Sequence, residues 1–411
     1  MAREDNPRTC PQCGNPLLAG ATECPRCDNG LFVLLHSREI VLSLTAAIVI
    51  VLFFLTGFIT RGYHRKLGAL GRQWFEAGEQ QLKSGNAAEA LADFHTALVY
   101  SPDDTQIQFQ LAQALAAEGR NSEARAYLLE LQAQAPSHAP INLALARISA
   151  GAGSEADAVR YYHGAIYGVW PNEAEANRLN ARLELCRFLI ARGDRSMAEA
   201  ELIALASEIP ERNGASLHGQ TGELFLSIGD ANRALSEFRS ALTAAHPPAD
   251  ALRSAGLAAY QIGEFQQAER YLDRARRLGN KGADVSDALD ISRMVTSADP
   301  YARGLSEAER RERARRNFEQ AFGRLQSCAK SRGIDLFAKG APQSELVTLG
   351  RQAKELEPQL TDQNIRQHPG QIDVAMNFVF VTEDAVTQEC GAPQGMDEAL
   401  TLMGKFPGRE R

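Results

Sequence analysis

Four of the seven cysteines lie within the first 27 residues, in two CxxC pairs whose spacing suits a metal ion. The first pair is Cys10 and Cys13, and ten residues separate it from Cys24 and Cys27. Each CxxC turn can present two thiolates to the same ion, and four thiolates complete the tetrahedral coordination of Zn²⁺. The sequence therefore predicts one structural zinc, with no open coordination position for catalysis.

Residues 1–35 hold too few apolar side chains to fold on a core, so metal binding would have to supply the folding free energy. A c-type haem site needs histidine after the second cysteine of a pair, where Gly14 and Asp28 stand instead. A thioredoxin-like redox pair needs a βαβ pattern, and a DNA-binding ribbon needs clustered basic residues; neither is present. Two disulfides or metal-free thiols stay as alternatives. The segment Cys10 to Cys27 resembles the zinc-ribbon modules at the N-termini of many bacterial membrane proteins.

A run of twenty-one residues without an ionisable side chain, from Ile40 to Thr60, follows this head. As a helix it would span ~32 Å, about the hydrocarbon thickness of a bilayer. No small-residue cleavage site follows it, which disfavours a removed signal peptide. A helix that is apolar on all sides is also rare in a soluble protein. We therefore expect a transmembrane helix over 40–60, followed by a linker over 61–70.

The charge and composition of the chain exclude some classes of function. The 51 acidic and 44 basic residues give a net charge of −7, which argues against nucleic-acid binding because that needs a basic patch. Runs of β-branched residues are scarce outside the apolar segment, and alanine and leucine are frequent. The composition therefore predicts an all-α protein.

Residues 71–280 repeat a pattern of small residues at intervals of about 34. The alanines that share one frame are spaced by 34, 34, 40, 36 and 34 residues, and each follows a glycine by five positions. They are Ala90, Ala124, Ala158, Ala198, Ala234 and Ala268. With Trp74, Phe94 and Pro102 at signature positions of the first unit, the pattern resembles the tetratricopeptide repeat (TPR), a helix–turn–helix unit. The resemblance implies six units stacked in a right-handed superhelix, or α-solenoid.

In the TPR family, the first helices of successive units line a concave groove. If that geometry holds, the residues that face the groove include Arg72, Phe75, Phe109, Arg147, Arg187, Arg253 and Tyr260. Apolar side chains interleaved with arginines suit a protein or peptide partner that carries carboxylates, although ordinary solvated side chains are the alternative reading. The asparagine pattern of chaperone-binding members is absent. Cys186 falls where the two helices of a unit cross, so we expect a buried free thiol there.

The last part of the chain resembles no family that we can name. We expect a capping helix and linker over 281–300 and a helical domain over 301–411, whose first long helix begins with a capping box. Cys328 and Cys390 lie on apolar stripes near the ends of two long helices, so a disulfide could join them; two buried free thiols are the alternative. No grouping of catalytic residues is evident, and we expect neither enzyme activity nor a small-molecule substrate.

These features together predict a membrane-anchored TPR scaffold for protein–protein interaction or complex assembly. The alternatives are an assembly factor in envelope biogenesis (secretion, pilus or cytochrome assembly), and a transmembrane sensor that couples ligand binding in the array to the zinc head. The expected location is a bacterial inner membrane, crossed once.

The signals for orientation in the membrane conflict. Two basic residues near the span precede it and four follow it: Arg26 and Arg38, then Arg61, Arg65, Lys66 and Arg72. The positive-inside rule thus favours a cytoplasmic array. A site of zinc-binding thiolates, however, belongs in a reducing compartment. We give the thiol chemistry more weight and predict a cytoplasmic zinc ribbon and a periplasmic array.

Overall fold

The structure is a computed structural model that describes residues 8–18, 21, 23, 24, 26, 27, 37–210, 213–244, 247, 250–338 and 343–406. Within these ranges the secondary structure is helical apart from two isolated β-bridges, so the predicted all-α class is confirmed. The chain forms two compact units, residues 1–131 and residues 132–411.

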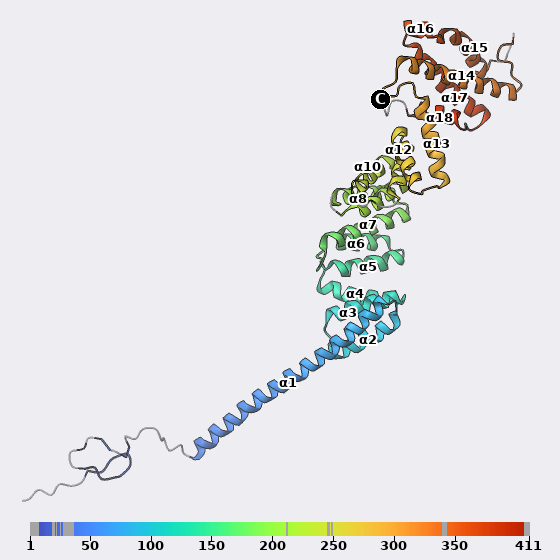
Figure 1. The fold of residues 1–411 in the computed structure, drawn as a ribbon. Helices are drawn as coiled ribbons and strands as arrows, with labels where there is room; N and C mark the ends of the chain where they lie inside the picture. Colours follow the sequence, from blue (N-terminus) through green and yellow to red (C-terminus); the bar gives the residue numbers. More distant parts are fainter. Residues whose placement is uncertain are drawn as a thin grey trace, which may run out of the picture. The chain divides into compact units, whose positions relative to one another are not determined.

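One long helix, α1, dominates the first unit and runs unbroken from Ser37 to Lys83 (Figure 1). Its 47 residues span ~70 Å at 1.5 Å per residue. Side chains 41–60 are exposed, and the helix is long and apolar enough to cross a membrane, with a mean hydropathy of 2.6 in its most apolar stretch. Residues 61–70, which the sequence predicts as a linker, are helical. No proline interrupts them, so the apolar segment continues directly into the first helix of the repeats.

Three further helices complete the first unit: α2 (Ala87–Tyr100), α3 (Thr105–Ala117) and α4 (Asn121–Gln134), whose last residues pass the boundary of the unit. The end of α1 packs closely on α2. A Cβ atom added to Gly78 would lie 2.7 Å from Cε1 of Phe94, which is fully buried. Glycine is therefore required where this pair of helices crosses.

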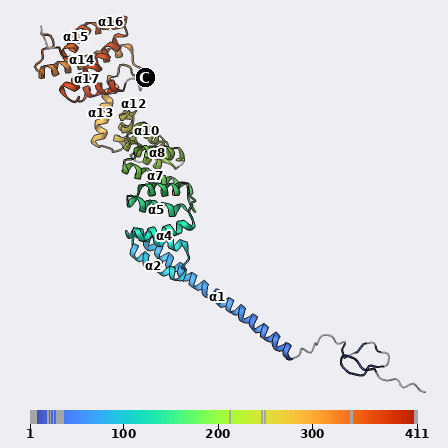
Figure 2. The same ribbon diagram turned by 180° about the vertical axis from the view of Figure 1, so that it is seen from behind.

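The second unit continues the helical pairs, which stack in chain order in both views (Figures 1 and 2). The helices are α5 (Ala139–Gly151), α6 (Glu155–Ile166), α7 (Ala174–Arg192), α8 (Arg195–Glu208), α9 (Ala215–Ser227), α10 (Ala231–Leu242), α11 (Ala251–Gln261), α12 (Phe265–Arg277) and α13 (Ala283–Ala298). The same close crossing recurs: an added Cβ would lie 2.7 Å from Phe238 at Gly222 and 2.6 Å from Leu272 at Gly256. Cys186 occupies this position in the α7–α8 pair and is fully buried and free, as expected.

The junction between α6 and α7 departs from the regular repeat, at the place where the alanine spacing rises to 40. The extra residues form the loop before α7 and lengthen α7 to 19 residues. The loop is held by a bridge in which the Val169 amide donates to the Ser137 carbonyl at 2.7 Å. Glu173 adopts the left-handed conformation, with φ of 45°, immediately before the helix. The extra residues between α6 and α7 therefore do not interrupt the stacking of the helical pairs.

The C-terminal helices are α14 (Glu307–Ser331), α15 (Glu345–Leu356), α16 (Asp362–Gln367), α17 (Gln371–Cys390) and α18 (Met396–Lys405), with a 3-10 turn at Glu357–Leu360. They share one hydrophobic core with the end of the array, because Phe265 of α12 and Ile291 of α13 belong to it. The ring of Phe406 lies 6.0 Å from that of Phe265, and an added Cβ on Gly263 would lie 2.4 Å from Phe406. The C-terminal helices therefore cover the last repeat.

Candidate functional sites

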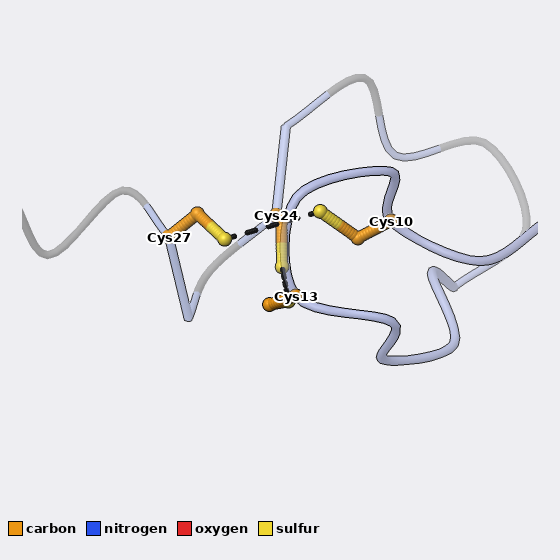
Figure 3. A group of neighbouring side chains, drawn as sticks. All are labelled: Cys10, Cys13, Cys24 and Cys27. Atoms are coloured by element: carbon orange, nitrogen blue, oxygen red, sulfur yellow. Dashed lines mark hydrogen bonds between the residues drawn. The ribbon is translucent and has the colours of Figure 1, made fainter.

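The four head cysteines converge although they come from two separate turns (Figure 3). Their Sγ atoms lie within 4.8 Å of one another, with 3.9 Å between Cys10 and Cys27 and 3.6 Å between Cys13 and Cys24. Around an ion with metal–sulfur bonds of ~2.3 Å, tetrahedral geometry places sulfur atoms ~3.8 Å apart, whereas a disulfide needs ~2.05 Å. The cluster has the dimensions of a tetrahedral four-thiolate site and could hold a metal ion.

Backbone hydrogen bonds shape the turns that present these thiols. The Cys10 amide donates to the Asn15 carbonyl at 2.8 Å, and the Gly14 amide donates to the Cys10 carbonyl at 2.9 Å. Gly14 has φ of 71°, a conformation that side chains disfavour, so a glycine follows the first CxxC pair. In the second turn the Cys27 amide donates to the Cys24 carbonyl at 2.9 Å. The local sequence thus aims two pairs of sulfur atoms at one point.

The thiols differ in their readiness to ionise. Hydrogen bonds from the backbone of Gln12 and of Cys13 lower the pKa of the Cys10 thiol to about 7. A hydrogen bond to the side chain of Cys13 raises the pKa of Cys27 to about 12, because its proton is shared with neighbouring sulfur atoms. Four crowded sulfurs cannot all carry negative charge unless a cation lies between them. The donor set therefore fits a divalent, thiolate-binding ion.

Three of the predicted groove residues belong to the first unit. Arg72 is exposed on α1. Phe75 is half-buried, with its ring centroid 5.9 Å from that of Phe94, so part of its surface serves the packing of the first repeat. Phe109 is half-buried on α3.

Two predicted groove arginines of the second unit bind the next first helix along the array. Arg147 on α5 donates to both carboxylate oxygens of Glu184 on α7, at 2.9 and 2.6 Å. Arg187 on α7 donates to the side-chain oxygen of Gln220 on α9 at 2.6 Å. We call this row of bonds between successive first helices the inter-repeat ladder.

The inter-repeat ladder continues toward the C-terminus. Arg253 on α11 donates to Asp284 on α13, with Nε 3.0 Å from Oδ2, and Ser254 donates to Glu223 on α9. The three arginine bonds are exposed, and each contributes no more than ~1 kcal/mol. They nevertheless engage the guanidinium groups that the sequence analysis assigned to a partner's carboxylates. Sequence reasoning missed these bonds, although each arginine is followed about one repeat later by a side chain that can accept its hydrogen bond.

Tyr260, the remaining predicted groove residue, is half-buried at the end of α11. Its ring packs edge-on against Phe265 at 5.8 Å, and burial raises the pKa of its hydroxyl. Because it also contacts the core of the C-terminal helices, part of its surface is used in covering the last repeat.

A disulfide joins Cys328 of α14 to Cys390 of α17. Their Cα atoms lie 5.9 Å apart, within the ~7 Å that a disulfide can span. Cys328 is buried and Cys390 is exposed at the end of its helix. In contrast, burial raises the pKa of the free Cys186 thiol to about 12, which makes it unreactive.

A buried ion pair, Arg324 on α14 with Glu383 on α17, lies near this disulfide. Arg324 also donates to the Gly391 carbonyl at 3.2 Å and lies 3.6 Å from Asp397. Burial raises the pKa of Glu383 to about 7 despite the neighbouring guanidinium. The pair ties α14, α17 and the start of α18 together. Sequence reasoning missed it, although a glutamate on the apolar stripe of α17 was a usable signal.

Comparison with known proteins identifies the repeats. Residues 81–148 and 220–283 each match the tetratricopeptide repeat family. The chain therefore contains tetratricopeptide repeats, as the sequence predicts, and its fold is a TPR solenoid. Such repeats support a role in binding other proteins.

Individual relatives are similar over part of the chain. The TPR repeat-containing thioredoxin TTL4 of Arabidopsis thaliana is 35% identical over 114 residues, which are 27% of this chain and 16% of that protein. The solved structure of pilF from Pseudomonas aeruginosa shares 14% identity with a TM-score of 0.40, covering 54% of this chain and 97% of that one. PilW, a type IV pilus biogenesis factor, shares 17% identity with a TM-score of 0.40, covering 54% and 98%. At these scores the two structures say nothing of function.

Proposed function

We propose that this protein is a single-pass membrane scaffold that presents a TPR array to partner proteins. The observation that supports this most directly is α1, in which an exposed apolar segment and the first repeat helix form one continuous helix. A run of twenty exposed, mostly apolar residues would promote aggregation in water, whereas a bilayer would cover it. A helix also satisfies its own backbone hydrogen bonds, as the hydrocarbon region requires.

The part of α1 beyond the span gives the array a rigid connection to the membrane. Residues 61–83 would extend ~35 Å as a helix. They contain no proline, and the structure shows no break in them. The first repeat is therefore held at a set height above the lipid, which suits a scaffold that assembles partners at the membrane surface.

The ion held by Cys10, Cys13, Cys24 and Cys27 is Zn²⁺ in this proposal, because zinc prefers tetrahedral thiolate sites and needs no redox change. Bound zinc would supply the folding energy that the small head lacks. The four cysteines would hold the ion and leave no position for a substrate, so the zinc has a structural role and the proposed function needs no catalysis.

The reduced cysteines of the head and the disulfide of the C-terminal helices together support the predicted orientation. Zinc-binding thiolates persist in reducing compartments, whereas the Cys328–Cys390 disulfide persists in oxidising ones. The apolar segment of α1 separates the two in sequence, which suits a cytoplasmic head and a periplasmic array in a bacterial inner membrane. The count of basic residues points the other way, but it differs by only two charges.

Reporter fusions test the proposal. Alkaline phosphatase fused after Arg411 should be active, and a fluorescent protein fused before Met1 should fluoresce. The full chain should stay with the membrane after alkaline extraction. Release by alkali would contradict the anchor, and a phosphatase-negative C-terminus would reverse the orientation. Site-specific photocrosslinkers along α5, α7 and α9 should capture proteins; capture of secretion, pilus or cytochrome assembly components would specify a role in envelope biogenesis.

A second candidate function is a transmembrane sensor, which the unbroken course of α1 favours because movement of the first repeat would be carried along the apolar segment as far as Ser37. A helix-breaking insertion of Gly-Pro-Gly after Lys66 separates the two candidates. The scaffold should still hold its partners after this insertion. The sensor should lose the dependence of zinc-head protection on partner binding, measured by hydrogen exchange.

A further inference from the structure

A hollow in the second unit lies between the C-terminal ends of α7 and α9 and the turns that follow them. The residues that line it and matter here are Ile190, Leu226, Ile228, Gly193, Gly229 and Arg195. Ile190 and Leu226 are half-buried and Ile228 is buried, so the floor and walls are aliphatic. The two glycines contribute no side chain, which leaves the hollow open beside the turns.

Arg195, the first residue of α8, forms one edge of the hollow. Its guanidinium lies across the next turn, where a Cβ added to Gly229 would be 3.2 Å from Nη2. Among the described residues, its side chain has no ion pair or hydrogen bond. The charged groups around it are engaged elsewhere. Arg192 pairs with a glutamate of α6 at 3.2 Å, Asp194 caps α8, and Asp230 caps α10 and pairs with an arginine.

This setting differs from that of the predicted groove arginines, which lie on the first helices. Arg147, Arg187 and Arg253 bond to acceptors of the inter-repeat ladder, so a partner would have to displace an existing bond. Arg195 lies beside an apolar surface, and a partner could pair with its positive charge without displacing an existing bond. A ligand that fits must therefore carry an anionic group directly beside an aliphatic one.

We propose that this hollow binds the C-terminus of a partner protein that ends in an aliphatic residue such as leucine or valine. The terminal carboxylate pairs with Arg195, and the aliphatic side chain lies between Ile190 and Leu226. The inference rests on the proposed scaffold function and specifies one of its partners by chemistry.

Geometry favours a terminal carboxylate over an acidic side chain. In a C-terminal residue, the carboxylate and the side chain leave the same Cα atom, so both reach one small hollow. In an extended peptide, neighbouring side chains point to opposite sides. A glutamate next to a leucine would then direct its charge away from the surface that holds the leucine.

Fluorescence anisotropy on the detergent-purified full chain tests the proposal. The probe is a fluorescein-labelled decapeptide that ends in Gly-Ser-Ala-Val-Leu with a free carboxylate, compared with the same peptide as a C-terminal amide. The free carboxylate should bind roughly 2- to 5-fold more tightly, because Arg195 is exposed and exposed ion pairs add little binding free energy. Arg195→Gln should remove this difference. Arg192→Gln is the matched control, three residues away and outside the hollow, and should preserve it.

The results that overturn the proposal are clear-cut. They are equal binding of the two peptides, an undiminished preference in Arg195→Gln, or no binding by the unaltered protein. A terminal serine in place of leucine should weaken binding at least several-fold, and equal binding would also contradict the aliphatic pocket. Partner crosslinks on α5, α7 and α9 that persist in Arg195→Gln would show that the scaffold function holds when this inference fails. Absence of crosslinks in the unaltered chain would instead count against the scaffold itself.

Discussion

Loss of the Cys328–Cys390 disulfide should loosen the C-terminal helices while leaving the TPR array folded. The bond closes a loop across a sequence separation of 62 residues. In the chain-entropy relation, a loop of this length stabilises the folded state by ~4 kcal/mol at 25 °C. Engineered cases often fall short of this relation because unfolded chains keep residual structure, so we expect a destabilisation of about 2–4 kcal/mol.

Hydrogen exchange with mass spectrometry measures this change in the full chain. Protein purified in detergent is compared as oxidised, as reduced and as Cys390→Ser. Amides of α14 and α17 that open with the domain should exchange roughly 30- to 900-fold faster once the bond is lost, at 1.36 kcal/mol per tenfold. Amides of α5 to α8, far along the array, serve as the internal control and should not change.

Three results would count against this reasoning. Acceleration below about 3-fold would mean that the bond adds less than ~0.7 kcal/mol, so loop closure would not govern the stability of these helices. If the amides of Cys390→Ser exchange still faster after reductant is added, another disulfide must also stabilise these helices. Alkylation of both cysteines in intact membranes before reduction would remove the bond itself, and with it one support for a periplasmic array.

Three other predictions concern the head, the repeats and the buried charge. Metal-replete protein should contain one equivalent of zinc by elemental analysis and Cys24→Ser far less; equal contents would remove the site. Gly222→Ala should destabilise the fold by about 1–3 kcal/mol in urea, because its Cβ would overlap Phe238. Gly323→Ala on α14 is the control: its Cβ would lie in open space, so it should stabilise the fold by up to ~1 kcal/mol. If it destabilises the fold as much as Gly222→Ala does, close helix crossing is not the reason for the glycine at 222. Since burial raises the pKa of Glu383 from 4.5 to about 7, its contribution to stability should be full below pH 4.5 and decline as the pH rises through 7. Glu383→Gln should abolish that decline, and parallel pH profiles for both proteins would disprove it.

Much of the architecture was predictable because the relevant interactions are local or periodic. Gly222 and Phe238 lie 16 residues apart within one helical pair, and their contact follows from the geometry of that pair alone. The same holds for the CxxC turns, whose sulfur positions follow from a few backbone hydrogen bonds. The apolar run of α1 needs no tertiary contact to form a helix, since its backbone bonds are internal.

The use of the groove arginines was not predictable to the same degree. The sequence correctly placed Arg147, Arg187 and Arg253 on first helices, but their acceptors lie between 31 and 37 residues away. Which acceptor is reached depends on the rotation and shift between successive repeats. The helical conformation of residues 61–70, predicted as a linker, was likewise not evident, because nothing in their composition distinguishes a helical connection from a flexible one.

The sequence by itself determined the helical class, the repeat frame, the set of four clustered cysteines and the apolar segment, since each depends on spacing along the chain. Only the tertiary structure decided that Phe406 covers Gly263, that Arg324 meets Glu383, and that Arg195 lies beside an aliphatic hollow with no ion pair to any residue that the structure describes. These contacts join segments whose separation varies and whose meeting depends on how whole helices stack. Side chains of the same type therefore become a packing contact, a ladder bond or a binding group according to the neighbours that the fold supplies.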